Sequence, residues 1–332
     1  MKKVRVLLAG AAALALALVG CSAPAAPTGT TPAASGGTEQ VTVRMGIQPW
    51  IGYAQWHVAE AKGLLEAEGI NLELIELKSD SEQSAAFASG RIDVDNIASH
   101  TALLLKAQDI GLKIVMVEDN ATTADAILAR NGITSFADLK GKKVAYEQGA
   151  TSDLLLHAAL KANDMTLADI QPVPMPAADA GAALIAGQVD GAVTYEPYIT
   201  TALKESQEIA TIYDAAKHPG LISDVLVASD AFMAENPEVV RTLVGIWYAA
   251  VEEYNTNTPE SRRIIAEAVG ETAEDLDTAF EGVQYWGEAE NGSGFAEYVD
   301  TTLPMVLQSA KDAGIITSDV DPASAVTDQF LK

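Results

Sequence analysis

The chain has 332 residues, 48% of them hydrophobic, and its 46 acidic and 21 basic residues give a net charge of −25 at pH 7. A surface this acidic repels nucleic-acid phosphates, so the composition argues against a nucleic acid as a partner. The chain has one cysteine, Cys21, and cannot form an internal disulfide.

The first residues have the pattern of a secretory leader. Three basic residues precede an apolar run from Val6 to Val19 that is too short to span a bilayer. The run ends at Gly20 and Cys21, and the whole pattern resembles the signals of bacterial lipoproteins, in which the cysteine is acylated and becomes the new N-terminus. We therefore expect residues 1–20 to be a signal peptide and Cys21 to carry a lipid anchor. An ordinary secretory signal followed by a chance cysteine is the alternative.

Residues 22–40 consist mainly of Ala, Pro, Thr, Gly and Ser, without apolar periodicity. Such a segment cannot bury enough apolar surface to offset its chain entropy, so residues 21–40 are expected to be the lipidated cysteine and a disordered tether. The folded part then begins near Val41. Its length of about 290 residues suffices for two lobes or one large domain, and loss of the leader's basic residues brings the net charge to −28.

The first part of the folded chain alternates between strand and helix patterns. Period-two alternation or short apolar runs predict strands at 41–47, 70–77, 91–95 and 114–117, and helical periodicity predicts helices at 56–68, 81–89 and 101–108. The order β-α-β-α-β-α-β indicates an open sheet with covering helices.

A second series of the same kind follows. Strands are expected at 124–130, 142–146, 173–175 and 191–194, and helices from 135, from 149 to 160, and over 178–186. The repeated order predicts two similar lobes. Each series also has a small-residue helix that leads through Gly to Asp, in Ala88–Asp93 and Ala186–Asp190, which is weak support because Gly and Asp favour turns anywhere.

The remainder of the chain has a helical composition beyond Asp224. Asn236 followed by Pro237 predicts a helix start, and further helices are expected at 259–269, 273–280 and 294–313. Five apolar residues fall on one face of the helix that starts at Pro237, and we expect them to be core rather than ligand contacts: Val240, Leu243, Trp247, Val251 and Tyr254.

Several strings occur in a specific order and spacing. They are Ala59–Gly63 leading to Glu68–Ile70, Leu139–Ala145, Gly187–Val193, Glu196–Tyr198 and Asn236–Glu238. Together they resemble the substrate-binding proteins of the nitrate/taurine/sulfonate class of ABC importers, from Val41 to about Leu331.

The resemblance implies an α/β fold of the two-lobed, venus-flytrap, type II periplasmic-binding-protein class, with two open sheets, helices on both faces and a helical C-terminal segment. Lobe one would comprise 41–122 plus 223–332, and lobe two 123–222. The resemblance further implies an extracytoplasmic, lipid-anchored protein, expected to be a monomer, that delivers a small ligand to an ABC permease and its ATPase. Ligand would bind in the interlobe cleft at the carboxyl ends of the strands.

Residues that follow the expected strands are therefore the candidate ligand contacts. They are Trp50, Tyr53, Asn96, Ser99, His100, Asp119, Asp125, Gly149, Thr151, Ser152, Glu196 and Asp224. A tryptophan in such a loop can form a flat wall against a ligand or pack beneath the loop as core. Asn96, Ser99 and His100 could supply hydrogen bonds.

Gly149, Thr151 and Ser152 lie at a strand-to-helix turn, where free backbone N–H groups, hydroxyls and the helix dipole favour an anion such as a sulfonate. The alternative is that Thr151 only caps the helix.

Four acids follow strands or lie at the expected crossings between lobes: Asp119, Asp125, Glu196 and Asp224. If they meet in the cleft beside Trp50, Tyr53, Tyr195 and Tyr198, they favour an ammonium or guanidinium cation. Each alone fits a hinge or a helix cap equally well, and a zwitterion such as taurine would use both kinds of group. We favour a small sulfonate or taurine-like ligand. A cationic amine, a guanidinium compound and a pyrimidine or vitamin precursor are the alternatives.

An enzyme is the main rival class, because relatives with this fold make the pyrimidine of thiamine. Those relatives carry a cysteine-rich string, whereas this chain has no cysteine after Cys21, and it has none of the common phosphate-loop, zinc-protease or nucleophile-elbow motifs. We expect no catalytic residues, no cofactor and no metal. A surface-tethered sensor without a permease is a third possibility that the sequence does not separate from transport.

Overall fold

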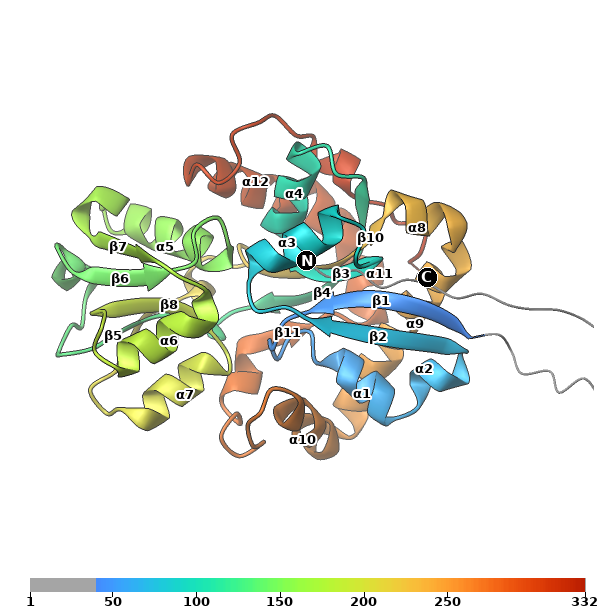
Figure 1. Ribbon diagram of the computed structural model, residues 1–332, viewed down its shortest axis with the longest axis horizontal. Coiled ribbons are helices and arrows are strands. Elements are labelled where there is room, and N and C mark those ends of the chain that lie inside the picture. Colours follow the sequence, from blue (N-terminus) through green and yellow to red (C-terminus); the bar gives the residue numbers. More distant parts are fainter. Residues whose placement is uncertain (1–39, 332) are drawn as a thin grey trace, which may run out of the picture. The chain divides into compact units, whose positions relative to one another are not determined.

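The computed structural model describes residues 40–331 (Figure 1). The expected signal peptide, the lipidation site at Cys21 and nearly all of the expected tether lie outside these residues. In the part of the chain that is described, no helix combines the length and the apolar character needed to cross a membrane.

Two separate mixed sheets organise residues 40–331. The first has six strands in the order β11-β4-β10-β3-β1-β2, and the second has five in the order β7-β6-β8-β5-β9. The strands of the first sheet are β1 (Val41–Ile47), β2 (Ile70–Glu76), β3 (Val94–Ala98), β4 (Leu112–Ala121), β10 (Ser223–Ser229) and β11 (Val283–Tyr285). Those of the second are β5 (Asp125–Ala129), β6 (Lys143–Tyr146), β7 (Gln171–Pro174), β8 (Gly191–Tyr195) and β9 (Ala210–Asp214).

Each sheet contains both parallel and antiparallel strand pairs. β1 pairs in parallel with β2 and β3, and β6 pairs in parallel with β7 and β8, whereas β10 lies antiparallel between β3 and β4 and β5 lies antiparallel between β8 and β9. The chain passes to the second sheet after β4 and returns before β10. This confirms the expected α/β class with two open sheets; the lobe boundaries stay a prediction.

Helices cover both faces of each sheet (Figure 1). They are α1 (Gln55–Ala61), α2 (Leu64–Ala67), α3 (Asp80–Ala88), α4 (Ser99–Ala107), α5 (Thr151–Ala162), α6 (Ala177–Ile185), α7 (Tyr198–Glu205), α8 (Asp230–Glu235), α9 (Pro237–Thr256), α10 (Thr258–Ala268), α11 (Glu288–Glu297) and α12 (Leu303–Asp312). Short 3₁₀ turns lie at Phe136–Leu139, Leu167–Asp169, Ala215–Lys217, Ala279–Gly282 and Pro322–Ala325, and a π turn at Tyr298–Thr302.

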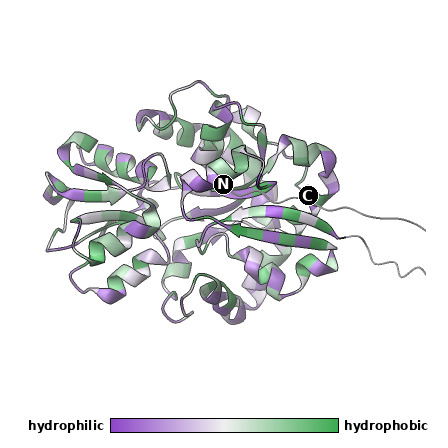
Figure 2. Cartoon of the chain, in the orientation of Figure 1, coloured by the Kyte–Doolittle hydropathy of each residue, from purple (hydrophilic) through white to green (hydrophobic). Residues whose placement is uncertain are grey.

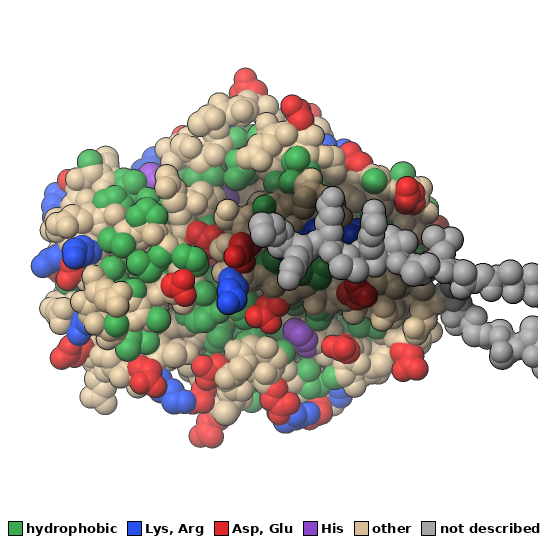
Figure 3. Space-filling model, in the orientation of Figure 1, with side chains coloured by type: hydrophobic (Ala, Val, Ile, Leu, Met, Phe, Trp, Pro, Cys, Tyr) green, Lys and Arg blue, Asp and Glu red, His purple; other side chains and the backbone are tan. Residues whose placement is uncertain are grey.

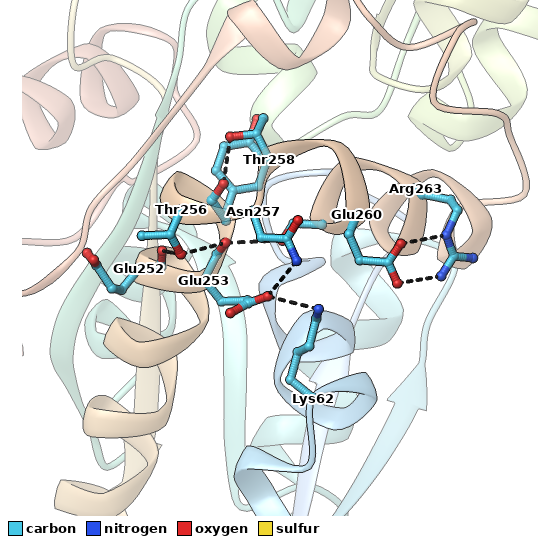
Figure 4. A network of polar contacts seen from close by, with 10 residues as sticks. Lys62, Glu252, Glu253, Thr256, Asn257, Thr258, Glu260 and Arg263 are labelled. Atoms are coloured by element: carbon cyan, nitrogen blue, oxygen red, sulfur yellow. Dashed lines mark hydrogen bonds and ion pairs between the residues drawn. The ribbon is translucent and has the colours of Figure 1, made fainter.

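The core of the first sheet is built on α9. Its five apolar residues expected on one face are all buried, and Trp247 packs on Trp56 of α1 with ring centroids 5.5 Å apart. Hydrophobic and hydrophilic residues alternate along the strands and helices (Figure 2). At the outer end of α9, Glu253 pairs with Lys62 at 2.8 Å and accepts a hydrogen bond from Asn257, which fixes the turn into α10 (Figure 4).

Two expected elements are displaced. The helix expected over 56–68 is two helices, because Gly63 adopts a left-handed conformation with φ 70°. The strand expected over 91–95 lies at Val94–Ala98, because Asp93 first turns its carboxylate back to the backbone N–H and guanidinium of Arg44.

Other errors lie in the C-terminal part. Residues 273–278 form turns rather than a helix, although Thr272 accepts from the N–H of Asp275 as a helix cap would, and residues 279–280 belong to the 3₁₀ turn. The helix expected over 294–313 begins at Glu288 and is interrupted by the π turn. β10 was missed where only helices were expected, and β9, β11, α7 and α8 were also missed.

The two similar segments Ala88–Asp93 and Ala186–Asp190 form equivalent turns in the structure. The backbone N–H of Arg44 in β1 donates to the Asp93 carboxylate at 3.0 Å, and that of Lys143 in β6 donates to the Asp190 carboxylate at 2.9 Å. In return, the N–H of each aspartate donates to the carbonyl of the same strand residue. The same pair of hydrogen bonds thus ties a helix-to-strand turn to the strand that lies second from one edge of each sheet.

Candidate functional site

A pocket between the two sheets gathers aromatic and acidic side chains. It is lined by Gln48, Trp50, Tyr53, Asp80, Asp125, Glu147, Ala150, Thr151, Ser152, Ala177, Tyr195, Ile222 and Asp224. Four of these lining residues are acids, and no Lys, Arg or His of residues 40–331 lines the pocket. Acidic side chains are also spread over the surface in Figure 3.

The aromatic wall comes from the loop after β1 and from the end of β8. Trp50 is only 5% exposed, and its ring meets that of Tyr195 edge-to-face at 5.8 Å. The loop after β1 is fixed by a hydrogen bond from the Tyr285 hydroxyl to the Ile51 carbonyl at 2.8 Å. Gly52 allows the close packing, since a Cβ there would collide with the Trp50 indole and the Asp119 carboxylate.

Asp125 and Asp224 face the pocket from different sheets. Asp125 begins β5 beside Tyr195, its partner in the strand register, and accepts no hydrogen bond from any residue in 40–331. Asp224 lies in β10, and its Oδ1 accepts a hydrogen bond from the Tyr53 hydroxyl at 3.0 Å. Each sheet therefore contributes one carboxylate with free acceptor capacity to the same pocket.

Burial makes these carboxyls hard to ionise. Desolvation raises the pKa of Asp224 to about 7, although the Tyr53 hydrogen bond acts in the opposite direction. Desolvation, followed by repulsion from Asp224, raises the pKa of Asp125 well above its usual range. Asp119 lies opposite Asp224 in the strand register, and the same two causes raise its pKa well above normal. A cation placed among these groups would reverse part of this cost.

The carboxylates of Asp80 and Glu147 accept hydrogen bonds from backbone N–H groups at the starts of helices, and these bonds connect the two halves of the molecule. The backbone N–H of Asp80, at the start of α3, donates to Glu147 Oε1 at 3.0 Å, and the N–H of Thr151, at the start of α5, donates to Asp80 Oδ2 at 3.3 Å. Glu147 Oε2 also accepts from the N–H of Ala177 at the start of α6. Desolvation and then the charge of Asp80 raise the pKa of Glu147 to about 7.

At the start of α5, expected to hold an anion, the N–H groups of Thr151 and Gly149 already bind carboxylates of the protein. The N–H of Thr151 binds Asp80, the N–H of Gly149 binds the Asp153 carboxylate at 2.9 Å, and the Ser152 hydroxyl accepts from the N–H of Glu147 at 2.9 Å. An oxyanion that binds the N–H of Thr151 would have to displace the Asp80 carboxylate.

Six of the candidate residues line the pocket: Trp50, Tyr53, Asp125, Thr151, Ser152 and Asp224. The other six lie behind it or beside it: Asn96, Ser99, His100, Asp119, Gly149 and Glu196.

Buried hydrogen-bond partners hold two of these six side chains, Asn96 and Ser99. Asn96 binds the Trp56 indole and the Gly46 carbonyl, and Ser99 bonds to Ser223 and Tyr298.

His100 is buried, which lowers its pKa. Glu196 Oε2 accepts from the N–H of Thr200 in the first turn of α7, as in the helix-cap alternative.

Three polar lining residues were missed, namely Gln48, Asp80 and Glu147. Gln48 directly follows β1, Glu147 directly follows β6, and Asp80 follows β2 by four residues. The rule that selected Trp50 and Tyr53, position after a strand, would have found all three if it had been applied to every strand.

No metal centre is evident in this part of the molecule. Within residues 40–331, no group of three or more His, Cys, Asp or Glu side chains is arranged to hold a metal ion. The acids in the pocket can instead hold an organic cation through hydrogen bonds and charge, with the aromatic rings supplying a face for it.

The chain has the periplasmic-binding-protein fold. Its structure is similar to the aliphatic sulphonate binding protein SsuA of Escherichia coli (TM-score 0.72, 22% identity, 86% of this chain and 97% of that one). It is also similar to the alkanesulfonate-binding protein SsuA of Xanthomonas axonopodis bound to MOPS (0.74, 19%, 87% and 99%) and to the nitrate-binding protein NrtA of Synechocystis (0.71, 16%, 86% and 85%).

Residues 50–260 match the model of the NMT1/THI5-like family, and the chain belongs to that family. A binding protein of Brucella abortus is 29% identical over 67% of this chain and 69% of its own length. The riboflavin-binding protein RibY of Chloroflexus aurantiacus is 27% identical over 100% and 99%, and the taurine-binding protein of Escherichia coli 22% identical over 83% and 88%. The resemblance inferred from the sequence strings is confirmed.

These relatives are binding proteins, but one other relative is an enzyme. The 4-amino-5-hydroxymethyl-2-methylpyrimidine phosphate synthase of Aspergillus parasiticus is 29% identical over 57% of this chain and 59% of its own length. The ligands in the relatives' names differ widely, so membership of the family does not define the ligand of this chain.

Proposed function

We propose that this protein is the extracytoplasmic solute-binding component of an ABC importer and that it captures a small organic cation. The observation that supports the ligand class is that Asp125 and Asp224, one from each sheet, line the same pocket beside aromatic side chains. No Lys, Arg or His of residues 40–331 lines that pocket. The binding proteins among its relatives support the transport role.

The cation would be a protonated amine, an amidine or guanidinium compound, or a protonated aminopyrimidine. Its charged N–H groups would donate to Asp125 and to Asp224 Oδ2, and its body would lie against Trp50, Tyr53 and Tyr195. Hydrogen bonds between charged partners are among the strongest that a protein makes. A sulfonate or taurine-like ligand, favoured from the sequence, remains untested. It ranks second because the donors at the start of α5 already bind carboxylates.

Closure of the lobes over the cation would give the signal for transport. Asp125 and Asp224 repel each other when both are ionised, and a cation between them turns that repulsion into attraction from both sheets. The ligand would thus bind the closed state more tightly than the open one and shift the population toward it. The cavity volume is only about 30 Å³, room for about one or two water molecules, so the lobes would have to part to admit a ligand.

The anchor and the partners complete the proposal. Acylation at Cys21 would tether the protein outside the cytoplasmic membrane, and the closed monomer would dock on a permease driven by an ATPase. Substitution Cys21→Ala should remove the mass of a diacylglyceryl group and release the protein from the membrane fraction. Retention of that mass would contradict the anchor.

A thermal-unfolding screen of the purified protein tests the ligand class. The panel pairs butylammonium with butanesulfonate and adds guanidinium, agmatine, taurine, nitrate, riboflavin and aminopyrimidines. A ligand at about a hundredfold over its dissociation constant adds about 2.7 kcal/mol, enough to raise Tm by several degrees. Cations should raise Tm and butanesulfonate should not; the reverse pattern would contradict a cation site.

The same samples test the enzyme alternative. Incubation with the stabilising ligand should return it chemically unchanged, as judged by mass spectrometry. Conversion of that ligand by the purified protein would contradict a role limited to binding.

A further inference from the structure

Asp80 is, with Glu147, one of the two acids in the pocket that the proposed ligand chemistry does not use. It lies at the start of α3, in the first sheet's half of the molecule, while its carboxylate reaches the start of α5 in the other half. Both of its oxygens are engaged, since Oδ1 accepts from Gln48 Nε2 at 2.8 Å and Oδ2 from the N–H of Thr151 at 3.3 Å. It is therefore not a free acceptor for a cation, unlike Asp125.

Local structure frees Asp80 for this contact. Ser79 caps α3, its hydroxyl accepting from the N–H of Glu82 at 3.2 Å, so α3 does not need the Asp80 side chain as its cap. Gln48 fixes the carboxylate from one side and is itself held by the Tyr195 hydroxyl at 3.3 Å and by Gln83. The side chain is thus oriented by its surroundings rather than by its own helix.

The position that Asp80 occupies is the one most favourable to an anion in this pocket. Ala150, Thr151 and Ser152 line the pocket at the start of the twelve-residue helix α5, where the helix dipole and free N–H groups attract negative charge. With the Asp80 carboxylate bonded to the N–H of Thr151, an incoming sulfonate or phosphate would meet a negative charge in front of that donor.

We propose that Asp80 is the residue that determines the charge specificity of the pocket, because its carboxylate fills the place at the start of α5 where an anionic group would otherwise bind. The inference rests on the proposed ligand-binding role of this pocket. It makes the rejection of anions a property of one side chain, separate from the attraction of cations by Asp125 and Asp224.

The test compares binding of methanesulfonate and of butylammonium by calorimetry in the purified wild-type protein and in three variants. Asp80→Ser empties the position and exposes the Thr151 N–H. Asp80→Asn removes the charge but keeps the position filled. Asp319→Ser removes one acid whose side chain is fully exposed and far from the pocket lining, which controls for net charge.

Methanesulfonate should bind Asp80→Ser about tenfold or more tightly than it binds the wild type, which corresponds to one charge-assisted hydrogen bond. Asp80→Asn and Asp319→Ser should show no such gain. If Asp80→Ser unfolds at the assay temperature, Asp80→Ala replaces it with the same expectation.

Three results would overturn the inference: no gain in a folded Asp80→Ser or Asp80→Ala, an equal gain in Asp80→Asn, or wild-type binding of methanesulfonate as tight as that of Asp80→Ser. Failure of butylammonium and the other cations to bind the wild type would count against the proposed ligand class instead, and would leave the anion comparison valid.

Discussion

The hydroxyl of Tyr53 lies 3.0 Å from Oδ1 of Asp224, which joins the loop after β1 to strand β10 at the floor of the pocket. Both residues are buried, and the hydrogen bond favours the ionised form of Asp224 against the cost of desolvation. The contact therefore helps to keep a charged acceptor available to a cation near neutral pH.

Loss of this hydrogen bond should raise the pKa of Asp224 above about 7. In Tyr53→Phe, the pH at which cation binding reaches half of its maximum should move upward, and the free energy of unfolding should fall by about 1–3 kcal/mol because a buried acceptor loses its donor. Calorimetric titrations across pH measure the first effect and denaturant unfolding the second. An unchanged pH profile would show that Asp224 does not control binding.

Asp125 and Asp224 should contribute far more to cation affinity than the nearby acid Glu196. Asp125→Asn and Asp224→Asn should each weaken cation binding by about tenfold to a hundredfold, since each removes one charged hydrogen-bond partner. Glu196→Gln is the matched control, because Glu196 is equally buried but caps α7 outside the lining. A loss of affinity in Glu196→Gln as large as in the other two would contradict the site described here.

Stability should fall as pH rises. Burial raises the pKa of Glu147, Glu196 and Asp224 to about 7, so the folded protein binds more protons than the unfolded chain between their ordinary values and about pH 7. The stability present below about pH 4 is lost through this window, and Tm should be higher at about pH 5 than at about pH 8. Glu196→Gln should reduce the slope, and a Tm that rises over this range would be incompatible with the raised pKa values.

Trp50 should contribute an aromatic face and report on binding. A cation held over an indole gains about 0.5–2 kcal/mol, so Trp50→Leu should weaken binding by about threefold to thirtyfold and abolish the ligand-induced change in fluorescence. Trp286→Phe removes an indole outside the pocket lining and should leave both unchanged. If Trp50→Leu retains full affinity for the cation, the Trp50 ring does not contact the ligand and has only a packing role.

The fold was largely readable from the sequence because strand and helix periods are local. Val41–Ile47 alternates cleanly, and the stripe from Val240 to Tyr254 recurs at helical spacing, so β1 and α9 were found. β10 was missed because Ser223–Ser229 is buried on both faces between two antiparallel neighbours and so has no alternating pattern. Its place in the sheet depends on residues far away in the chain.

The site was only partly readable. Position after a strand identified Trp50 and Tyr53, and position at a strand end or lobe crossing identified Asp125 and Asp224, because strand ends converge at the cleft. The same reasoning expected an anion at Thr151, since a sequence cannot show that Asp80, 71 positions earlier, occupies that helix start.

The central claim is tested most directly by titrating the purified protein, in one calorimeter series at about pH 8 where Asp224 is ionised, with butylammonium and with butanesulfonate. The two probes share an alkyl chain and differ in the sign of the head group. We predict saturable binding of butylammonium that is lost in the Asp125→Asn, Asp224→Asn double variant, and no binding of butanesulfonate. Saturable binding of butanesulfonate, with none of butylammonium, would contradict the account.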